Sequence, residues 1–239
     1  LIGVVGTDDV DLNDSSNWTG TFSDASVETD KTVTVTGLKP LTGNHAGNYT
    51  IPEEYLTSAT IGKKELTVSG ITAENKVYDG DDEATLSGNG SLIGVVGTDD
   101  VDLNDSSNWE GTFSDADAGS YKTVTVTELD LIGDDAVKYT IAPYTTTATI
   151  GKKELTVSNI TANDREYDGT TVATLGSTYS LDGIVEGETV TLDTTASTWI
   201  GSFADANAGD DKQVAVTDLI PTGTHGANYT VAPYTTDAT

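Results

Sequence analysis

The chain has 239 residues, of which 39 are Asp or Glu and only 11 are Lys or Arg, so its formal net charge at pH 7 is −28. A field of this sign repels phosphates, which disfavours nucleic acids and anionic membrane surfaces as partners. The absence of cysteine excludes disulfides and cysteine-based zinc sites. The sequence contains no run of about 18 apolar residues, so it does not predict a membrane-spanning segment.

The first segment of the chain, Leu1–Trp18, recurs without a single change as Leu92–Trp109. A third, more diverged copy follows, in which Leu181, Gly183 and Trp199 stand at matching positions. Self-similarity of this kind predicts an array in which each unit is one folded module. Because a catalytic site needs one constellation of unlike groups, the threefold repetition favours an architectural function over an enzyme.

The next pattern is a strict alternation of Val with Thr in residues 31–36, which recurs at 122–127 and, loosened, at 212–217. A period of two residues predicts a strand with one buried face. No apolar stripe with the period of a helix persists for three turns. We therefore predict an all-β chain.

Each unit also carries one Trp that is followed four residues later by one Phe. Side chains an even number of positions apart on a strand point to the same face. We therefore predict that the Trp and the Phe of each unit are buried side by side as core anchors. The three pairs are Trp18 with Phe22, Trp109 with Phe113, and Trp199 with Phe203.

Turn signals separate these segments at short intervals, including Asp-Gly at 79–80 and 168–169 and Asn-Gly at 89–90. Such dipeptides favour the positive φ values of tight turns. About seven or eight short strands in roughly ninety residues are typical of an immunoglobulin-like β-sandwich. A β-grasp-like unit is the structural alternative, although no segment of the sequence supports its helix.

The junctions between units lie at 60–68 and 149–157, where one alternating segment runs straight into the next. No tether rich in Pro, Ser or Gly intervenes, so we expect a stiff, elongated rod of tandem β-sandwiches. This frame gives a partial unit at 1–62, which lacks its first strands, and complete units at 63–151 and 152–239. A unit without those strands is expected to expose sheet edges and core.

Several motifs occur in a fixed order within the units. They are the Tyr-Asp-Gly segments 76–80 and 165–175, Gly-Thr-Phe-Ser-Asp at 111–115, the Lys-Thr-Val strand at 122–127, and Asn-Tyr-Thr at 228–230. The whole chain thereby resembles the YDG-type repeat, which occurs in tandem in very large bacterial surface proteins and haemagglutinin-like adhesins.

The resemblance implies an extracellular, mostly β, non-catalytic stalk module. The middle unit departs from the pattern at 137–139, where it has Val-Lys-Tyr in place of the Asn-Tyr of the other two units. Within the Tyr-Asp-Gly motif we expect a structural role: Asp-Gly makes the turn, and the ring of Tyr78 or Tyr167 packs while its hydroxyl bonds a backbone group.

Clusters of Asp in the first two units have the oxygen ligands that calcium prefers, but not the spacing of an EF-hand loop. The matching positions of the third unit carry Glu188, Thr189 and Thr191, so the fold does not require a metal there. We therefore favour solvated carboxylates, and calcium remains the alternative. The clusters are Asp8, Asp9, Asp11 and Asp14, and Asp99, Asp100, Asp102 and Asp105.

The two histidines, His45 and His225, stand four residues before a Tyr in the first and last units, where the middle unit has Asp135. No nucleophile motif accompanies them, so we expect surface loop residues and no catalytic, cofactor or metal site. A crosslink between Lys63 or Lys64 and an Asn of the Asn-Tyr-Thr segment is a further hypothesis.

The sequence thus predicts structural stalk repeats of a bacterial cell-surface or secreted adhesin that project a distal binding domain in adhesion or biofilm formation. The partners that we expect are the neighbouring repeats of the same chain, and the isolated chain is expected to be a monomer. The alternative is a set of modules that themselves bind cell-surface glycans or host proteins. A repeated, exposed aromatic platform would favour that alternative.

Overall fold

The computed structural model describes residues 1–194 and 199–238. In these residues the regular secondary structure consists of short β-strands and single 3-10 turns, without an α-helix. The prediction of an all-β chain is confirmed, and the helix of the alternative β-grasp unit is not found in the described part. No helical segment described is long and apolar enough to cross a membrane.

The chain forms two compact units, and neither coincides with one sequence repeat, because the middle repeat contributes segments to both. The first unit consists of Leu1–Val68, Ser91–Asn104 and Asp130–Ala142, and the second of Ser69–Gly90, Asp105–Leu129 and Pro143–Thr239.

Antiparallel pairing dominates the first unit, where strands β1, β2 and β3 form one sheet. A second sheet has the order β14-β4-β9, with β14 parallel to β4. The elements of this unit are β1 (Thr19–Phe22), β2 (Glu28–Thr36), β3 (Tyr55–Ile61), β4 (Lys64–Ser69), β9 (Ser91–Ile93), β10 (Asp102–Leu103), β13 (Leu131–Ile132), β14 (Tyr139–Ile141), η1 (Ser15–Asn17), η2 (Ala46–Asn48) and η4 (Ala136–Lys138).

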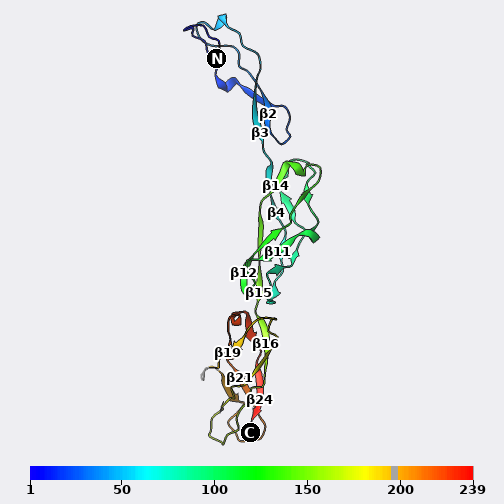
Figure 1. Cartoon of the computed structure of the whole chain (residues 1–239), viewed down its shortest axis with the longest axis vertical. Coiled ribbons are helices and arrows are strands. Elements are labelled where there is room, and N and C mark those ends of the chain that lie inside the picture. Colours follow the sequence, from blue (N-terminus) through cyan, green and yellow to red (C-terminus); the bar gives the residue numbers. More distant parts are fainter. Residues whose placement is uncertain (195–198, 239) are drawn as a thin grey trace. The chain divides into compact units, whose positions relative to one another are not determined.

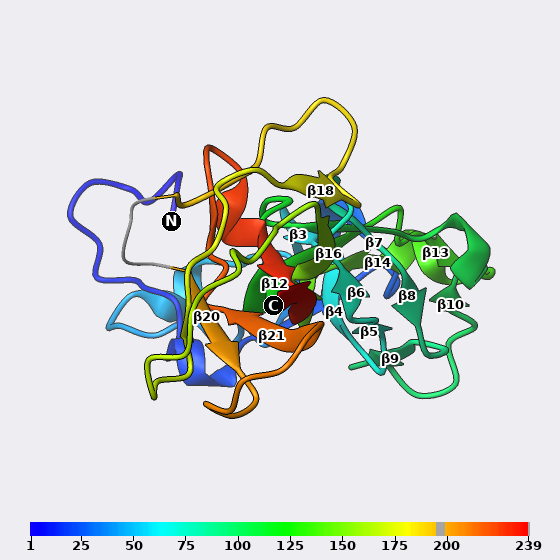
Figure 2. The same cartoon turned by 90° about the horizontal axis from the view of Figure 1, so that it is seen from below.

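The second unit contains a five-stranded sheet, β6-β15-β12-β11-β7, and a four-stranded sheet, β17-β20-β21-β24. Figure 1 shows β12 beside β15, and Figure 2 shows β20 beside β21. Its elements are β5 (Thr72–Ala73), β6 (Lys76–Val77), β7 (Glu83–Ala84), β8 (Leu86–Ser87), β11 (Glu110–Phe113), β12 (Gly119–Thr127), β15 (Tyr144–Gly151), β16 (Lys153–Ser158), β17 (Val172–Ala173), β18 (Ser180–Asp182), β19 (Thr191–Leu192), β20 (Ile200–Phe203), β21 (Lys212–Thr217), β22 (Pro221–Thr222), β23 (Tyr229–Val231), β24 (Tyr234–Ala238), η3 (Ser106–Asn108) and η5 (Gly226–Asn228).

The alternation of Val with Thr has the predicted consequence in β12. Val124 and Val126 are buried in the core, whereas the Thr residues between and beside them are exposed. Strand β21 repeats this pattern with Val214 and Val216. Several sheets, in which β12 and β21 each bury one face, are consistent with the predicted β-sandwich.

The predicted core anchors are only partly confirmed. Trp109 is 9% exposed and Phe113 is 2% exposed, as expected for buried residues. Trp199, however, is only half-buried, with its ring edge-on to Tyr179 at 5.6 Å between centroids. Trp18 is 37% exposed. The prediction of a buried Trp in every unit is therefore wrong for the first and last repeats.

The Trp and the Phe of the last repeat also lie in different clusters of the core. Trp199 packs on a cluster that includes Val157 and Val216, whereas Phe203 belongs to one with Val214 and Ala238. Side chains four positions apart on a strand share a face but lie about 13 Å apart along it. A shared face was therefore not enough to make them neighbours.

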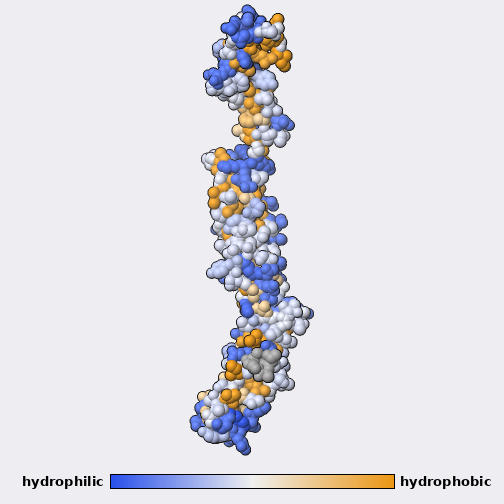
Figure 3. Space-filling view, turned by 90° about the vertical axis from the view of Figure 1, so that its left-hand side faces the viewer, coloured by the Kyte–Doolittle hydropathy of each residue, from blue (hydrophilic) through white to orange (hydrophobic). Residues whose placement is uncertain are grey.

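The first repeat exposes apolar side chains that its complete counterpart covers. Tyr55 is 63% exposed whereas its counterpart Tyr144 is half-buried, and Trp18 is 37% exposed whereas Trp109 is 9% exposed. A groove beside Tyr55 is lined by Trp18, Leu38 and Ile51. The orange residues at the top of Figure 3 lie over this repeat.

Candidate functional site

The Tyr-Asp-Gly segment of the middle repeat forms a tight turn that receives a side chain of the last repeat. Lys76 holds the turn, because its Nζ lies 2.7 Å from Asp79 Oδ1 and 2.5 Å from Asp81 Oδ1. Gly80 has φ of +91°, and a Cβ added to it would lie 2.9 Å from Val185 Cγ1. Because glycine has no Cβ, Gly80 can adopt the left-handed backbone conformation and also leaves room for the close approach of Val185.

The tyrosine of this motif shares a carboxylate with a second tyrosine. The hydroxyl of Tyr78 donates a hydrogen bond to Glu188 Oε1, and that of Tyr229 donates to Glu188 Oε2 at 2.5 Å. The two rings are edge-on, with centroids 5.4 Å apart. The prediction that the Tyr78 ring packs is confirmed, but its hydroxyl bonds a side chain of the next repeat and not a backbone group.

Burial has an electrostatic consequence for both phenols. Desolvation, followed by the hydrogen bond to the Glu188 carboxylate, raises the pKa of Tyr78 and that of Tyr229 to about 12. The hydroxyl of Tyr229 also accepts a hydrogen bond from the backbone N–H of Val185 at 3.0 Å. The neutral phenols are therefore held in place as donors to the carboxylate.

A second connection between the repeats is the side-chain amide of Asn228, which is only 3% exposed. Its Nδ2 donates to Asp117 Oδ1 at 2.9 Å, and its Oδ1 accepts from the backbone N–H of Ala118 at 2.9 Å. One amide thus satisfies a donor and an acceptor of the preceding repeat. The proposed crosslink partner in this segment is therefore occupied by hydrogen bonds to Asp117 and Ala118.

The core is continuous across this connection. Tyr78, Phe113 and Ile150 of the middle repeat belong to the same buried cluster as Leu155 and Tyr229 of the last repeat. Only one residue separates β15 from β16. These contacts define an inter-repeat joint. The middle repeat provides its tail surface (Tyr78, Gly80, Asp117 and Ala118), and the last repeat provides its head surface (Val185, Glu188, Asn228 and Tyr229).

The head surface recurs in the other repeats with one variable position. Tyr49 donates to Asp8 Oδ2 at 2.7 Å in the first repeat, and Tyr139 donates to Asp99 Oδ2 at 2.7 Å in the middle repeat. The residue before the tyrosine is Asn in the first and last repeats. In the middle repeat it is Lys138, whose Nζ lies 2.6 Å from Asp135 Oδ1.

The exposed side chains of the Asp clusters also accept hydrogen bonds from the local backbone. Asp14 and Asp105 cap the η1 and η3 turns, and their hydrogen bonds to backbone N–H groups lower the pKa of both carboxyls. Asp100 Oδ2 accepts from the backbone N–H of Asp134 at 3.3 Å, and Asp102 Oδ1 from that of Leu103 at 2.8 Å. Asp100, Asp102 and Asp105 are exposed, so the interpretation of the cluster as solvated carboxylates agrees with the structure, which adds their hydrogen bonds to the backbone.

The equivalent groups of the first cluster behave alike. Asp9 Oδ2 accepts from the backbone N–H of Asn44 at 3.0 Å, and Asp11 Oδ1 from that of Leu12 at 2.8 Å. Within residues 1–194 and 199–238, no three His, Cys, Asp or Glu side chains are grouped so that they could hold a metal ion.

His45 has a structural role that the sequence did not reveal, whereas the matching Nδ1 of His225 has no hydrogen-bond partner in the described residues. His45 Nδ1 accepts from the backbone N–H of Asp9 at 3.0 Å, and in the middle repeat Asp135 Oδ2 accepts from Asp100 N–H at 2.8 Å. Either side chain therefore ties the same two loops together. His225 is half-buried, so the expectation of a surface residue is correct for His45 but not for His225.

Sequence reasoning missed the residues that connect the repeats, which include Asp117, Val185, Glu188 and Asn228. The only signal was the Asn-Tyr pair and its replacement by Lys138-Tyr139 in the middle repeat. In the sequence, Glu188 stands out only as a departure from the Asp cluster.

Comparison with known proteins gives one match. The family model of the YDG domain matches the chain three times, at residues 1–59, 62–148 and 151–237. No curated protein and no solved structure matches the chain.

Proposed function

Because the chain belongs to the YDG domain family and carries that domain three times, we propose that it is a structural spacer of an extracellular bacterial adhesin. In this proposal the repeats form part of a stalk on the cell surface or on a secreted protein, and they project a distal binding domain. The observation that carries the proposal is the inter-repeat joint, in which residues of the Tyr-Asp-Gly motif contact the next repeat.

The joint explains how such a spacer resists bending. A hinge motion between the two repeats would separate the Glu188 carboxylate from Tyr78 and the Asn228 amide from Asp117. Each hydrogen bond that is lost with a buried partner costs about 1–3 kcal/mol. Rotation would also open the shared core, so the joint favours one orientation.

Single-molecule fluorescence tests this function in the whole chain. Since the chain has no cysteine, Thr125→Cys and Ala215→Cys place one dye on an exposed position of each repeat. We expect one narrow distance distribution, which broadens when Glu188→Ala and Asn228→Ala are added. A broad distribution in the parent chain would show a flexible tether and contradict the spacer.

The alternative function, recognition of glycans or host proteins by each repeat, has less support. The most exposed tyrosine, Tyr121, is 84% exposed but is replaced by Asp30 and Asp211 at the matching positions. An exposed aromatic platform therefore does not recur at this site. A glycan array probed with the whole chain tests this alternative, and specific binding abolished by Tyr121→Ala would favour it.

A further inference from the structure

The chain enters the last repeat and passes out of it through strands that are bonded to each other. It enters through β16, which follows β15 after a single residue, and it passes through β23 into β24. Strands β16 and β23 are parallel, with Lys153 paired with Tyr229 and Leu155 with Val231. The backbone N–H of Ala232 also donates to the carbonyl oxygen of Leu155 at 2.9 Å. The entry strand is therefore hydrogen-bonded to a strand close to the exit.

The direction of these two strands decides how tension along the chain loads their hydrogen bonds. Tension acts on the N-terminal end of β16 and, through β24, on the C-terminal end of β23. Because the strands are parallel, these two ends lie at opposite ends of the pair, so tension draws the strands past each other in shear. All the bonds of the pair then carry the load together. In an antiparallel pair the two ends would lie side by side, and the bonds would open one after another.

Buried side chains separate this pair from water. Leu155 is 0% exposed and Tyr229 is 1% exposed, and both belong to the core cluster of the joint. A hydrogen bond in such surroundings is electrostatically stronger than one in water. The Tyr229 hydroxyl, bonded to Glu188 and Val185, also fixes the N-terminal end of β23. On its other edge β16 pairs with β18, as Figure 2 shows.

The middle repeat contains the same parallel pair in the same register. Its strands β4 and β14 pair Lys64 with Tyr139 and Leu66 with Ile141. The backbone N–H of Ala142 donates to the carbonyl oxygen of Leu66 at 2.9 Å. Leu66 is 0% exposed and Tyr139 is 3% exposed. The arrangement is therefore a property of the repeat and not of one copy.

The Tyr-Asp-Gly segment adds a second parallel pair at the junction between the middle and last repeats. Strand β6 is parallel to the end of β15, with Lys76 paired with Ile150 and Val77 with Gly151. The backbone N–H of Tyr78 donates to the carbonyl oxygen of Gly151 at 2.8 Å. Tension on β16 reaches β15 through the one residue between them, so it loads the β6–β15 pair in shear as well.

We propose that the parallel pair β16–β23 is a mechanical clamp that keeps the last repeat folded under tension along the chain. The matching pair β4–β14 has the same role in the middle repeat. This inference rests on the proposed spacer function, because a stalk that carries a distal binding domain is pulled along its length. It adds to that function the strands on which resistance to force depends.

The test pulls the last repeat of the whole chain in two directions with optical tweezers. Since the chain has no cysteine, the handles are attached at introduced cysteines. Lys152→Cys with Asp237→Cys loads the clamp in shear, whereas Lys152→Cys with Thr224→Cys separates β16 and β23 from their N-terminal ends. All three positions are exposed. We expect the unfolding force to be several-fold higher in the shear direction.

Ala232→Pro removes one bond of the clamp, because proline has no N–H to donate to Leu155. Resistance to force depends on the rate of unfolding. We expect this variant to unfold about tenfold faster than the parent at a fixed force in the shear direction. The comparison of the two pulling directions needs no substitution in the clamp, so it decides the proposal even where the proline variant does not fold.

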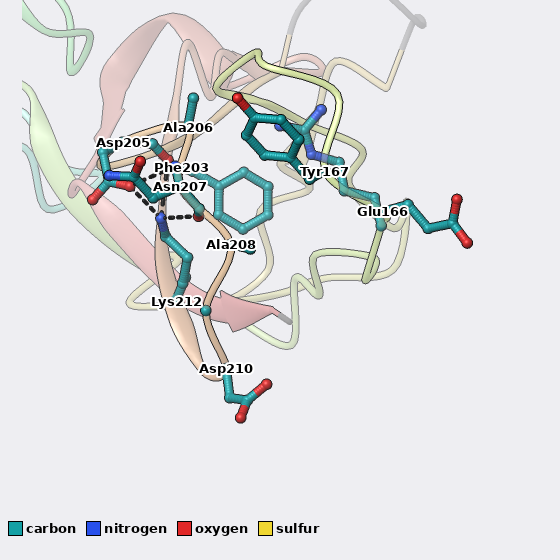
Figure 4. A pocket seen from close by; sticks show the side chains of 11 residues that line it. Glu166, Tyr167, Phe203, Asp205, Ala206, Asn207, Ala208, Asp210 and Lys212 are labelled. Atoms are coloured by element: carbon teal, nitrogen blue, oxygen red, sulfur yellow. Dashed lines mark hydrogen bonds and ion pairs between the residues drawn. The ribbon is translucent and has the colours of Figure 1, made fainter.

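Phe203→Leu is the matched control. Phe203 belongs to another core cluster, whose described members lie outside β16 and β23. Figure 4 shows its ring at a pocket that Tyr167 and Lys212 also line. This variant should lower the stability measured by urea unfolding but leave the unfolding force in the shear direction nearly unchanged.

Equal unfolding forces in the two directions would overturn the clamp, and so would a folded proline variant that unfolds no faster than the parent. The spacer function would survive that result, because it is tested by the width of the fluorescence distance distribution. A broad distribution together with a higher force in shear would instead contradict the spacer and leave the clamp in place.

Discussion

At the scale of single residues, Glu188 connects two repeats through one side chain. Its two carboxylate oxygens accept from two tyrosine hydroxyls that belong to different repeats. Asp8 and Asp99 occupy the same place in the other repeats and each accepts from the tyrosine of its own head. The additional methylene of Glu188 extends its carboxylate toward the preceding repeat.

Replacing this carboxylate should weaken the joint without disturbing either repeat. A glutamine has one acceptor oxygen for two donors, so Glu188→Gln should lower the free energy of unfolding by about 1–3 kcal/mol. Glu188→Asp is the matched control, because Asp99 shows that an aspartate still holds the tyrosine of its own head. Urea unfolding followed by Trp fluorescence measures the free energy of unfolding of both variants. A glutamine variant as stable as the parent would contradict this role.

The raised pKa values of Tyr78 and Tyr229 predict how the joint responds to alkali. Burial, and then the hydrogen bond to Glu188, raises the pKa of each from 10.0 to about 12. The folded state therefore holds these protons more tightly than the unfolded state. Their contribution to stability is complete below pH 10 and is lost as the pH rises from 10 to 12.

Ultraviolet titration of the chain measures this directly. Of its ten tyrosines, Tyr78 and Tyr229 should ionise among the last, and Tyr78→Phe should remove one phenol from the late phase. Titration of all ten tyrosines in a single phase near pH 10 would show that neither phenol is held in the joint.

At the scale of elements, each repeat fastens its long strand to the preceding turn by the same ion pair. Lys31, Lys122 and Lys212 stand near the buried valines of β2, β12 and β21, and each is paired with an Asp seven residues earlier. In β12 the pairing with β15 shifts between Gly119 and Lys122. Tyr121, within this bulge, has φ of +53°, and the matching Asp30 and Asp211 also have positive φ. This local kink before the Lys therefore recurs in every repeat.

The two identical segments that end in Trp18 and Trp109 provide an internal comparison of core packing. Trp109→Ala should cost about 3–5 kcal/mol, because the ring is 9% exposed and its removal leaves a cavity. Trp18→Ala should cost about 1–2 kcal/mol, because 37% of that residue is exposed to water. Denaturant unfolding of the two variants measures the difference. Equal costs would show that the local sequence, and not the strands packed around it, sets the burial.

At the scale of the whole molecule, the spacer function predicts an extended chain. A compact globule of 239 residues would have a radius of gyration of about 18 Å, and one repeat alone about 12 Å. We expect small-angle scattering from the monomer to give a radius well above the value for the globule. A radius near 18 Å would contradict the stalk.

Calcium should have little effect on the stability of the molecule. Asp100 and Asp102 already accept hydrogen bonds from the backbone, and the last repeat has threonines in their places. Any calcium site should therefore be weak and confined to the first two repeats. Binding at a concentration near the Kd adds only about 0.4 kcal/mol per site. Thermal melts in EDTA and in millimolar calcium should agree within a few degrees, and a much larger shift would show a structural metal.

The sequence by itself determined the repeat, the strands and the turns. These features depend on local patterns: alternation set which valines of β12 are buried, and Asp-Gly set the turn at Gly80. The acidic composition and the resemblance to the YDG domain also needed no structure. Burial of Trp109 followed from the pattern, but the half-exposure of Trp199 did not, because burial depends on what covers a face.

Only the tertiary structure decided how one repeat meets the next. Tyr78 and Glu188 are 110 residues apart in the sequence, as are Ala118 and Asn228. No local period relates such positions, and a hydroxyl or an amide accepts many partners. Packing of the shared core selects among those partners, because it brings Tyr78 of one repeat to Glu188 of the next and Ala118 to Asn228.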